Sequence, residues 1–438
     1  MTTPLRVLFV LSNLKNRSGM VLHVRDLAAA LQAQGHAPFV YAPKRGIIGD
    51  ELRSLRIPVL DSLDALHGPP DIIHGHTHVE TVLALLRIPD VPVVSTTHGL
   101  SWHNDPPPQF SRVMKYLAVS SGIRDRLIQQ HGLSPPRVEV LLNSVDLDRF
   151  APRSPLPARP ARALVFNGLP LFDHHPAIVE ACAARGMSVE VIGGSREERV
   201  AQPWTVLGDY DVIFARGRCA TEAAAVGAAV IVCGREGLGP LVTTSNLAET
   251  HSANFGADLL AQPVTTATVA AQLGGYDSLD AAEVSRRIRL EVGLDRAADI
   301  HVALYRTAID EYAPTRDWGG DPSLARRAID QDARLTADYV ERLNAYHRRV
   351  LDETSLKLRD ERDDARKWAG KLHADRTALT AKVSEMGAEL RRLREDVPRL
   401  VAERDRALVR LRSLQASALF RIQARLGGIR SRIRGRSR

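Results

Sequence analysis

The sequence predicts an α/β protein with two doubly wound, Rossmann-like domains, followed by a long α-helical coiled coil. Short β-branched runs alternate with helical patterns from residue 5 to residue 313, and a proline-rich segment interrupts this alternation once. The composition then changes to charged residues and helix formers. Strands that alternate with helices of this length form a parallel sheet covered on both faces. At 438 residues and 44% hydrophobic content, the chain can bury more than one core.

The first domain is expected to span residues 1–150. It begins with a strand at 5–11 and a helix at 21–36. The later elements are expected to be strands at 37–43, 71–76, 91–99, 116–121 and 137–143, and a helix at 122–132. Residues 151–160, APRSPLPARP, have no apolar period and are expected to form a linker.

The second domain is expected to span residues 161–313 and to repeat the same alternation. Its strands are expected at 163–168, 188–194, 210–215 and 228–234, and its helices at 175–186 and 220–227. The domain is expected to end in helical sequence, residues 281–313.

A coiled coil is predicted for residues 322–418. Between Leu379 and Ala418 apolar residues recur at spacings that alternate four and three, which is the heptad pattern. Arg404 is the one charged residue on this seam, and Pro398 should kink or locally open the helix. A coiled coil would make the protein a homo-oligomer, and a long solvated single helix is the alternative.

Residue usage predicts a protein kept in the reducing cytoplasm. Its cysteines, Cys182, Cys219 and Cys233, are widely spaced and form no metal-ligand pattern. The N-terminal apolar run is too short for a signal peptide, and no later stretch approaches the roughly 18 apolar residues that span a bilayer.

The strand-to-helix junction in residues 209–227, DYDVIFARGRCATEAAAVG, is a candidate site. Arg216 and Arg218 stand where the strand ends, and Glu222 lies at the start of the following helix. An anionic ligand would use the positive charge and the free N–H groups of a helix N-terminus. Capping is the other explanation, because a carboxylate there complements the helix dipole by about 0.3–1 kcal/mol while the arginines stay solvated.

Segments of the first domain resemble, in the right order, the landmarks of retaining glycosyltransferase family 4. They are residues 5–36, 71–76, 95–99, 116–132 and 138–150. Residues 210–244 resemble the donor-binding region of a subgroup with Arg-Gly-Arg before a Glu-Ala helix, and residues 254–256, NFG, also fit that subgroup. The resemblance covers residues 5–310 and implies a GT-B fold, in which two Rossmann-like domains face a cleft.

The resemblance implies an enzyme that transfers a sugar from a nucleotide-sugar donor to a glycan or lipid-linked acceptor, with retention of configuration, in bacterial cell-surface glycan synthesis. The second domain would bind the donor, through Arg216, Arg218, Glu222, Asn167 and Gly168. The nucleotide sugar is a co-substrate, and the resemblance implies no cofactor and no metal.

Two residues of the first domain complete the implied site. Gly19, in the loop after the first strand, would let the backbone approach a phosphate or sugar without a Cβ in the way. His98 ends a strand at the carboxyl edge of the first sheet, where doubly wound domains bind ligands. The resemblance implies that His98 is a catalytic residue that orients a donor hydroxyl or stabilises developing charge.

The second domain departs from the family pattern at two places. Phe214 stands where the first of two glutamates is usual, and no basic residue follows Asn167 and Gly168. Arg216 and Arg218 are the expected substitutes for the missing positive charge, and Asp173 or His174 could line the cleft. The family's usual glycine pair is here Gly19-Met20.

These departures leave other functions open. A catalytically degenerate GT-B scaffold that displays a coiled coil is one alternative, and a sugar-nucleotide epimerase with the same two-domain outline is another. His74, His76 and His78 would share one face if their strand continued, so a metal site is conceivable there. The strand is expected to end near His76, which argues against it.

The basic charge of the chain is confined to its tail, residues 419–438. The formal net charge is +8, and residues 421–438 hold seven arginines and no acidic residue, which leaves +1 for the remainder. Together with Phe420, Ile422 and Leu426, these arginines predict peripheral contact with an anionic membrane. Nucleic acid, which is less favoured, and a solvated, disordered end are the alternatives.

Overall fold

The structure is a computed structural model that describes residues 3–99, 106–166, 175–192 and 202–313, and single positions and short runs between residues 334 and 409. It divides into two units, Met1–Asp317 and Trp318–Arg438. The described positions of the second unit are helical. The pairing predicted for the coiled coil, residues 322–418, and the tail, residues 419–438, lie outside the described residues. No described helix is both long and apolar enough to cross a membrane.

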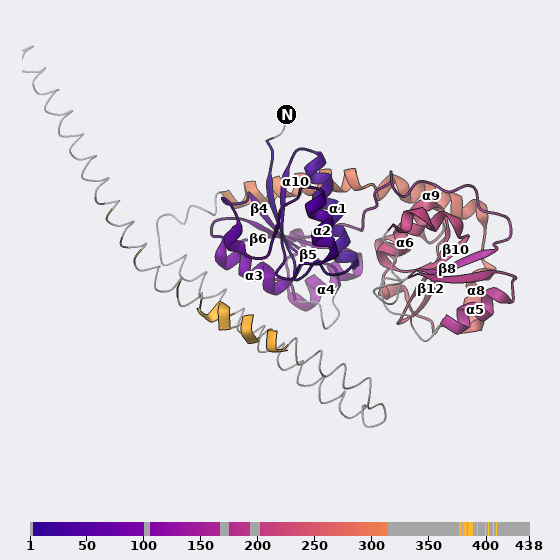
Figure 1. Ribbon diagram of the computed structural model, residues 1–438. Coiled ribbons are helices and arrows are strands. Elements are labelled where there is room, and N and C mark those ends of the chain that lie inside the picture. The colour runs from indigo at the N-terminus through magenta and orange to yellow at the C-terminus, as the bar shows by residue number, and fades with distance from the viewer. Residues whose placement is uncertain are drawn as a thin grey trace, which may run out of the picture. The chain divides into compact units, whose positions relative to one another are not determined.

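The first unit contains a seven-stranded sheet in which all neighbouring strands are parallel (Figure 1). The strand order is β3-β2-β1-β4-β5-β6-β7. The strands are β1 (Arg6–Val10), β2 (Ala37–Tyr41), β3 (Val59–Leu60), β4 (Ile72–Gly75), β5 (Val93–Thr97), β6 (Val113–Ala118) and β7 (Val138–Val140). Because β1 and β4 are neighbours, the direction of winding reverses between them.

Helices connect these strands. They are α1 (Gly19–Ala33), α2 (Ile47–Ser54), α3 (His78–Arg87) and α4 (Ser121–His131), with 3₁₀ turns at Leu63–Ala65 and Pro135–Arg137. The bounds of α4 follow from its end residues. Ser120 caps its start by accepting a hydrogen bond from the Ile123 N–H at 3.2 Å, and Gly132 ends it with a left-handed φ of 67°.

A second sheet of five strands has the order β12-β11-β10-β8-β9. The strands are β8 (Arg162–Phe166), β9 (Ser188–Ile192), β10 (Val212–Ala215), β11 (Ala229–Gly234) and β12 (Gly237–Leu241). All pairs are parallel except β11 with β12, which are antiparallel. The expected parallel strands are confirmed. The edge strand β12, with the sequence GLGPL, was not predicted because glycine and proline are poor strand formers.

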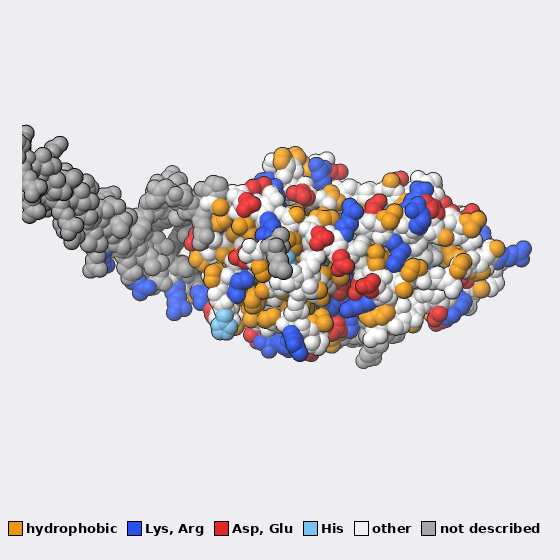
Figure 2. Space-filling model, turned by 90° about the horizontal axis from the view of Figure 1, so that it is seen from above, with side chains coloured by type: hydrophobic (Ala, Val, Ile, Leu, Met, Phe, Trp, Pro, Cys, Tyr) orange, Lys and Arg blue, Asp and Glu red, His pale blue; other side chains and the backbone are white. Residues whose placement is uncertain are grey.

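The helices between and after the strands of the second sheet are α5 to α9, with short 3₁₀ turns among them. The helices are α5 (His175–Ala183), α6 (Gly217–Val226), α7 (Leu247–Ser252), α8 (Thr266–Gly274) and α9 (Ser278–Glu291), and the turns are Pro203–Thr205, Leu207–Asp209 and Ala257–Leu259. On the face seen in Figure 2, Lys and Arg side chains are interspersed with Asp and Glu over the described residues. This mixture agrees with a body that is nearly neutral without its tail.

The last helix of the unit, α10 (Leu294–Tyr312), corrects the predicted domain boundary at residue 313. Figure 1 shows α10 beside α1, and its apolar residues belong to the core of the first sheet. Ala298, Leu304, Tyr305 and Ala308 are buried there together with Val94. The sequence predicted a helix here, but a helical pattern does not identify the sheet that the helix covers.

The boundary at residue 150 also differs from the prediction. Val145 and Phe150 are buried in the core of the second sheet. Val145 forms a β-bridge with Gly293, and its N–H donates to the carbonyl of Val292 at 2.7 Å. The chain therefore passes between the two cores just before Val145 and again just after Gly293. Within the predicted linker 151–160, the Arg153 N–H donates to the carbonyl of Val226, so this segment lies against the second core.

Candidate functional site

The winding reversal of the first sheet brings two predicted site residues to one edge. In doubly wound sheets, ligands bind outside the carboxyl ends of the strands at such a reversal. β1 leads there into the loop that ends at Gly19, the first residue of α1. The neighbouring strands β4 and β5 lead into His76 and His98. Gly19 and His98 therefore lie at the same edge of the sheet.

Histidine side chains gather at this edge. Their rings are those of His23 on α1, His74 in β4, His76 directly after β4, His98 directly after β5, and His301 on α10. The ring centroid of His98 lies 5.2 Å from that of His76 and 5.3 Å from that of His23. The His301 ring lies 5.9 Å from that of His23. We call these five residues the histidine cluster.

Hydrogen bonds hold four of the five rings, those of His74, His76, His98 and His301. Nδ1 of His74 is 2.7 Å from the Tyr305 hydroxyl, and its Nε2 is 2.6 Å from the Thr96 hydroxyl. Nδ1 of His301 donates to the carbonyl of Ala297 at 2.6 Å. Nδ1 of His76 is 2.9 Å from Nε2 of His98. Residues in or next to β4, β5 and α10 therefore fix these four rings.

The cluster is neutral near neutral pH. Burial lowers the pKa of His98 to about 4 and that of His301 to about 4. Burial also lowers the pKa of His23, His74 and His76 well below the ordinary value, and the neighbouring imidazoles lower it further. Several charged imidazoles in contact would repel one another in a poorly solvated place. These groups therefore offer neutral hydrogen-bond donors and acceptors.

The second sheet has its own winding reversal, between β8 and β10. β10 leads into Arg216, which is the residue before α6. Asn167 and Gly168 directly follow β8 in sequence, and they lie outside the described residues, as do Asp173 and His174. Arg216 is 23% exposed, and its Nη1 lies 2.7 Å from Glu236, which is 50% exposed. Arg216 is thus a partly accessible cation at the edge where a ligand is expected.

The loop 254–256 closes against the start of α6. Asn254 and Phe255 have φ angles of 55° and 47°, which are left-handed and unusual for residues other than glycine. This conformation lets the Phe255 carbonyl accept a hydrogen bond from the Gly217 N–H at 2.8 Å. The strained loop therefore takes up the first N–H of the helix, which a ligand would otherwise share.

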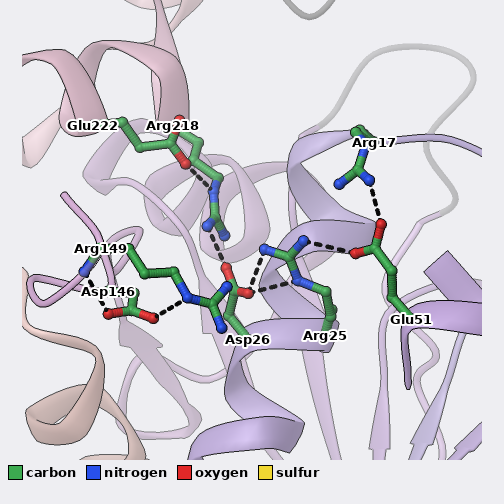
Figure 3. A network of polar contacts seen from close by, with 8 residues as sticks. All are labelled: Arg17, Arg25, Asp26, Glu51, Asp146, Arg149, Arg218 and Glu222. Carbon is green, nitrogen blue, oxygen red and sulfur yellow. Dashed lines mark hydrogen bonds and ion pairs between the residues drawn. The ribbon is translucent and has the colours of Figure 1, made fainter. Parts of the chain in front are cut away.

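Arg218 and Glu222 belong to a buried ion-pair network (Figure 3). Nε of Arg218 donates to Glu222 at 2.7 Å, and its Nη2 donates to Asp26 on α1. Asp26 also accepts from Nε of Arg25 at 2.7 Å. Beyond it, Glu51 on α2 accepts from Arg25 at 3.0 Å and from Arg17. Charges of opposite sign alternate along the whole network.

Burial and the ion pairs together shift the pKa values of Asp26, Glu222 and Arg218. Burial alone would raise the pKa of Asp26, but Arg218 and Arg25 outweigh it and hold that pKa below the ordinary value. Burial raises the pKa of Glu222, although Arg218 opposes the shift. Burial would lower the pKa of Arg218, and the carboxylates of Asp26 and Glu222 overcome this and raise it. Arg218 is therefore a permanent cation that two carboxylates already neutralise.

The two predicted arginines differ in their accessibility and in their partners. The sequence led us to expect both as phosphate partners, with capping and solvated arginines as the alternative. Arg216 remains accessible, whereas Arg218 is 7% exposed and is committed to Asp26 and Glu222, so it is neither solvated nor free. The binding roles of Gly19, His98, Arg216, Arg218 and Glu222 stay predictions.

Sequence reasoning missed Asp26, His23 and His301. A signal for two of them exists on α1, because Gly19, His23 and Asp26 follow one another at spacings of four and three and share one helix face. His23 and Asp26 are each 6% exposed, so this face buries polar groups. The charge of Arg218 also contributes to the lowered pKa of His23, after burial and the neighbouring histidines. The network and the histidine cluster are therefore electrostatically coupled.

His78 does not join His74 and His76. It is the first residue of α3, and its Nδ1 donates to the carbonyl of Pro106 at 2.8 Å. Among the described residues, no group of three or more His, Cys, Asp or Glu side chains is arranged to hold a metal ion.

Comparisons with known proteins agree with this architecture. Residues 17–149 match the family described as Glycosyltransferase Family 4. The structure is similar to that of Anabaena HepE in complex with UDP and glucose, with a TM-score of 0.51 and 14% identity over 68% of this chain and 99% of that chain. The HepE complex with UDP-glucose gives a TM-score of 0.50 and 14% identity over 69% of this chain and 100% of that chain.

A glycosyltransferase from Rickettsia africae gives a TM-score of 0.47 and 15% identity over 70% of this chain and 99% of that chain. No curated protein sequence matches this chain. The similarity to HepE shows that the two sheets form the GT-B fold.

Proposed function

We propose that this protein is a glycosyltransferase that moves a sugar from a nucleotide-sugar donor, bound at the second sheet, to an acceptor bound at the first. The observation that carries the proposal is the match of residues 17–149 to glycosyltransferase family 4, on a chain with the GT-B fold. HepE, which shares that fold, binds UDP and UDP-glucose. A uridine nucleotide is therefore the first donor to test.

The edge of the second sheet suits the donor diphosphate. Arg216 stands beside the N-terminus of α6, where the helix dipole and backbone N–H groups favour an anion. Its partner Glu236 is half exposed, so a phosphate can replace that carboxylate at little cost. In this proposal Arg216 binds the diphosphate directly, and Glu222 receives the ribose hydroxyls once Arg218 is drawn partly away from it.

The edge of the first sheet suits the reacting sugar. His98 is partly exposed there, and its pKa of about 4 leaves it neutral at cellular pH. A neutral imidazole orients a sugar oxygen by a hydrogen bond and does not deliver a proton as an imidazolium would. We assign His98 this orienting role.

Finer features of the proposal rest on the sequence. We propose transfer with retention of configuration, no metal requirement, and a cytoplasmic location in cell-surface glycan synthesis. Residues 322–418 would form the homo-oligomer, and residues 419–438 would contact the anionic inner face of the plasma membrane. Sedimentation with anionic liposomes before and after removal of residues 419–438 tests the membrane contact, and equal sedimentation would contradict it.

A donor screen tests the main proposal. The full chain is incubated with a panel of nucleotide sugars and an acceptor mixture, and the released nucleoside diphosphate and the melting temperature are measured. We expect one nucleotide to raise the melting temperature and Arg216→Ala to reduce that rise. If no nucleotide or nucleotide sugar changes the melting temperature, the protein has no donor site and the proposal fails. NMR of the product's anomeric proton then tests retention.

A non-catalytic scaffold is the second candidate. Phe214 is fully buried in β10 at the place of the first family glutamate, and Arg218 is neutralised by its neighbours. Both observations remove charge that donor chemistry would use. A nucleotide that binds without any turnover would favour this candidate.

A further inference from the structure

His76 and His98 form a hydrogen-bonded pair whose direction can be worked out. Nδ1 of His76 and Nε2 of His98 are 2.9 Å apart, so one of these nitrogens carries the hydrogen and the other accepts it. A neutral imidazole has one N–H and one bare nitrogen. Nε2 of His98 is engaged in either case, so the direction of the bond determines whether Nδ1 of His98, the nitrogen left for a ligand, carries a hydrogen.

The surroundings of His76 favour one direction. Its side chain is 6% exposed, and its Nε2 is buried without a hydrogen-bond partner among the described residues. If His98 donated, Nε2 of His76 would have to carry a buried N–H with no acceptor. If His76 donates from Nδ1, that same Nε2 is only a bare lone pair. A buried, orphaned N–H is the rarer and costlier arrangement, so donation by His76 is favoured.

The ring of His76 is also held in orientation. It stacks on Phe9 with centroids 6.0 Å apart and an interplanar angle of 22°. The His74 ring lies 4.2 Å away, and the His23 ring meets it edge-on at 63°. With rings around it, His76 cannot turn its Nδ1 away from His98 without moving its neighbours.

We infer that His76 is a positioning residue, which donates from Nδ1 to Nε2 of His98 and so fixes His98 in the tautomer that presents Nδ1–H to the substrates. The inference rests on the proposed role of His98 in glycosyl transfer. It adds the chemical class of the contact: the substrate atom that meets His98 is an acceptor oxygen, such as a sugar hydroxyl or phosphate oxygen. His98 in this tautomer cannot serve as a base at Nδ1.

The tautomer can be measured without any substrate. The full chain is labelled with ¹⁵N-histidine, and His98→Gln identifies the signal of His98 in long-range proton–nitrogen correlation spectra. We expect His98 to have a protonated Nδ1 and a bare Nε2 at neutral pH, and His76→Phe to remove that preference. A wild-type His98 that carries its proton on Nε2 would overturn the inference, whether or not the protein is active.

Kinetics give a second, independent readout once a donor is found. His76→Phe keeps an aromatic ring but cannot donate, so kcat should fall about 10-fold while the Kd for UDP stays unchanged. His76→Asn places an amide N–H near the position of Nδ1 and should recover most of kcat. An equal loss in both variants would contradict the positioning role.

His36→Phe is the matched control, because His36 accepts a hydrogen bond from the Leu5 N–H before β1, away from the carboxyl edge. It should change neither kcat nor the His98 spectrum. If no nucleotide sugar is turned over at all, the proposed function fails while the spectrum still decides the tautomer.

Discussion

Arg218 on α6 and Asp26 on α1 form a buried ion pair across 192 residues of sequence. Each side chain is 7% exposed, and Arg218 bonds Glu222 at the same time. The pair links a helix of the second sheet to a helix of the first. Asp26 shares a face of α1 with Gly19, and Arg218 lies in the first turn of α6, so the contact connects the two helices that begin at the expected substrate edges.

Removing Asp26 should destabilise the protein. Asp26→Ala leaves Arg218 and Arg25 buried with fewer partners, and breaking a buried pair costs about 3 kcal/mol. Urea unfolding followed by circular dichroism measures the loss. Asp50→Ala is the control, because the pair of Asp50 with Arg53 is exposed and should cost at most about 0.5 kcal/mol. Similar losses in the two variants would show that the buried pair contributes no more than an exposed one.

The sequence predicted the elements that carry this contact but not the contact itself. Hydrophobic runs and glycine breaks located β10, α6 and α1, because these signals are local. The partner of Arg218 depends on how the two sheets pack against each other, and the residues near Arg218 in the sequence do not indicate that packing. Because its partner Asp26 was not foreseen, Arg218 was expected to be a free cation that binds a phosphate together with Arg216.

Replacing each arginine of the junction should separate binding from stability. Arg216→Ala removes a partly exposed side chain, so the free energy of unfolding should change by at most about 1 kcal/mol. The Kd for UDP should rise about 10-fold or more, because a charge-assisted bond to phosphate is lost. Isothermal titration calorimetry measures the Kd.

Arg218→Ala should instead lower the free energy of unfolding strongly. It leaves Asp26 and Glu222 buried without their counterion, which should cost about 3–5 kcal/mol. Equal stability of the two variants in urea would mean that burial does not distinguish the arginines.

The histidine cluster shows a similar limit of sequence reasoning. His98 was predicted at the end of a strand, and β5 ends directly before it. His301 lies on α10, whose apolar face could have covered either sheet, so its contact with His23 was not predictable. The spacing of Gly19, His23 and Asp26 on one face of α1 was visible in the sequence and was the signal to use.

Gly19 offers a direct test of substrate approach. A Cβ added there would meet no described atom within 4 Å, so Gly19→Ala should change the free energy of unfolding by less than about 1 kcal/mol. If the donor or acceptor approaches the backbone here, kcat/KM should still fall about 10-fold. Gly132→Ala is the reverse control. Its φ of 67° resists a side chain, so it should cost about 1 kcal/mol and leave kcat/KM unchanged. An unchanged kcat/KM in Gly19→Ala would place the substrate elsewhere.

The buried histidines should make the protein sensitive to acid. The folded pKa of His98 and of His301 is about 4, whereas an unfolded histidine titrates near its ordinary value of about 6.5. Above that value both states are neutral and the stability contribution is complete. As the pH falls from 6.5 toward 4, these histidines become protonated in the unfolded state but stay neutral in the folded state, so stability is lost over this window.

The size of the acid effect can be measured against a variant. Each of these two histidines should contribute up to about 3 kcal/mol of lost stability by pH 4, and His23, His74 and His76 add to it. Burial raises the pKa of Glu222, so protonation of Glu222 in acid favours the folded state. This single group opposes the five histidines of the cluster, so the net effect of acid is destabilising. The free energy of unfolding is measured in urea from pH 7.5 to 5, a range set about the ordinary histidine pKa. The slope of the free energy of unfolding against pH reports how many more protons the unfolded state binds, and His301→Gln should lower this number by about one. A wild-type free energy of unfolding that stays constant over this range would mean that the histidine cluster is charged or solvated in the folded protein.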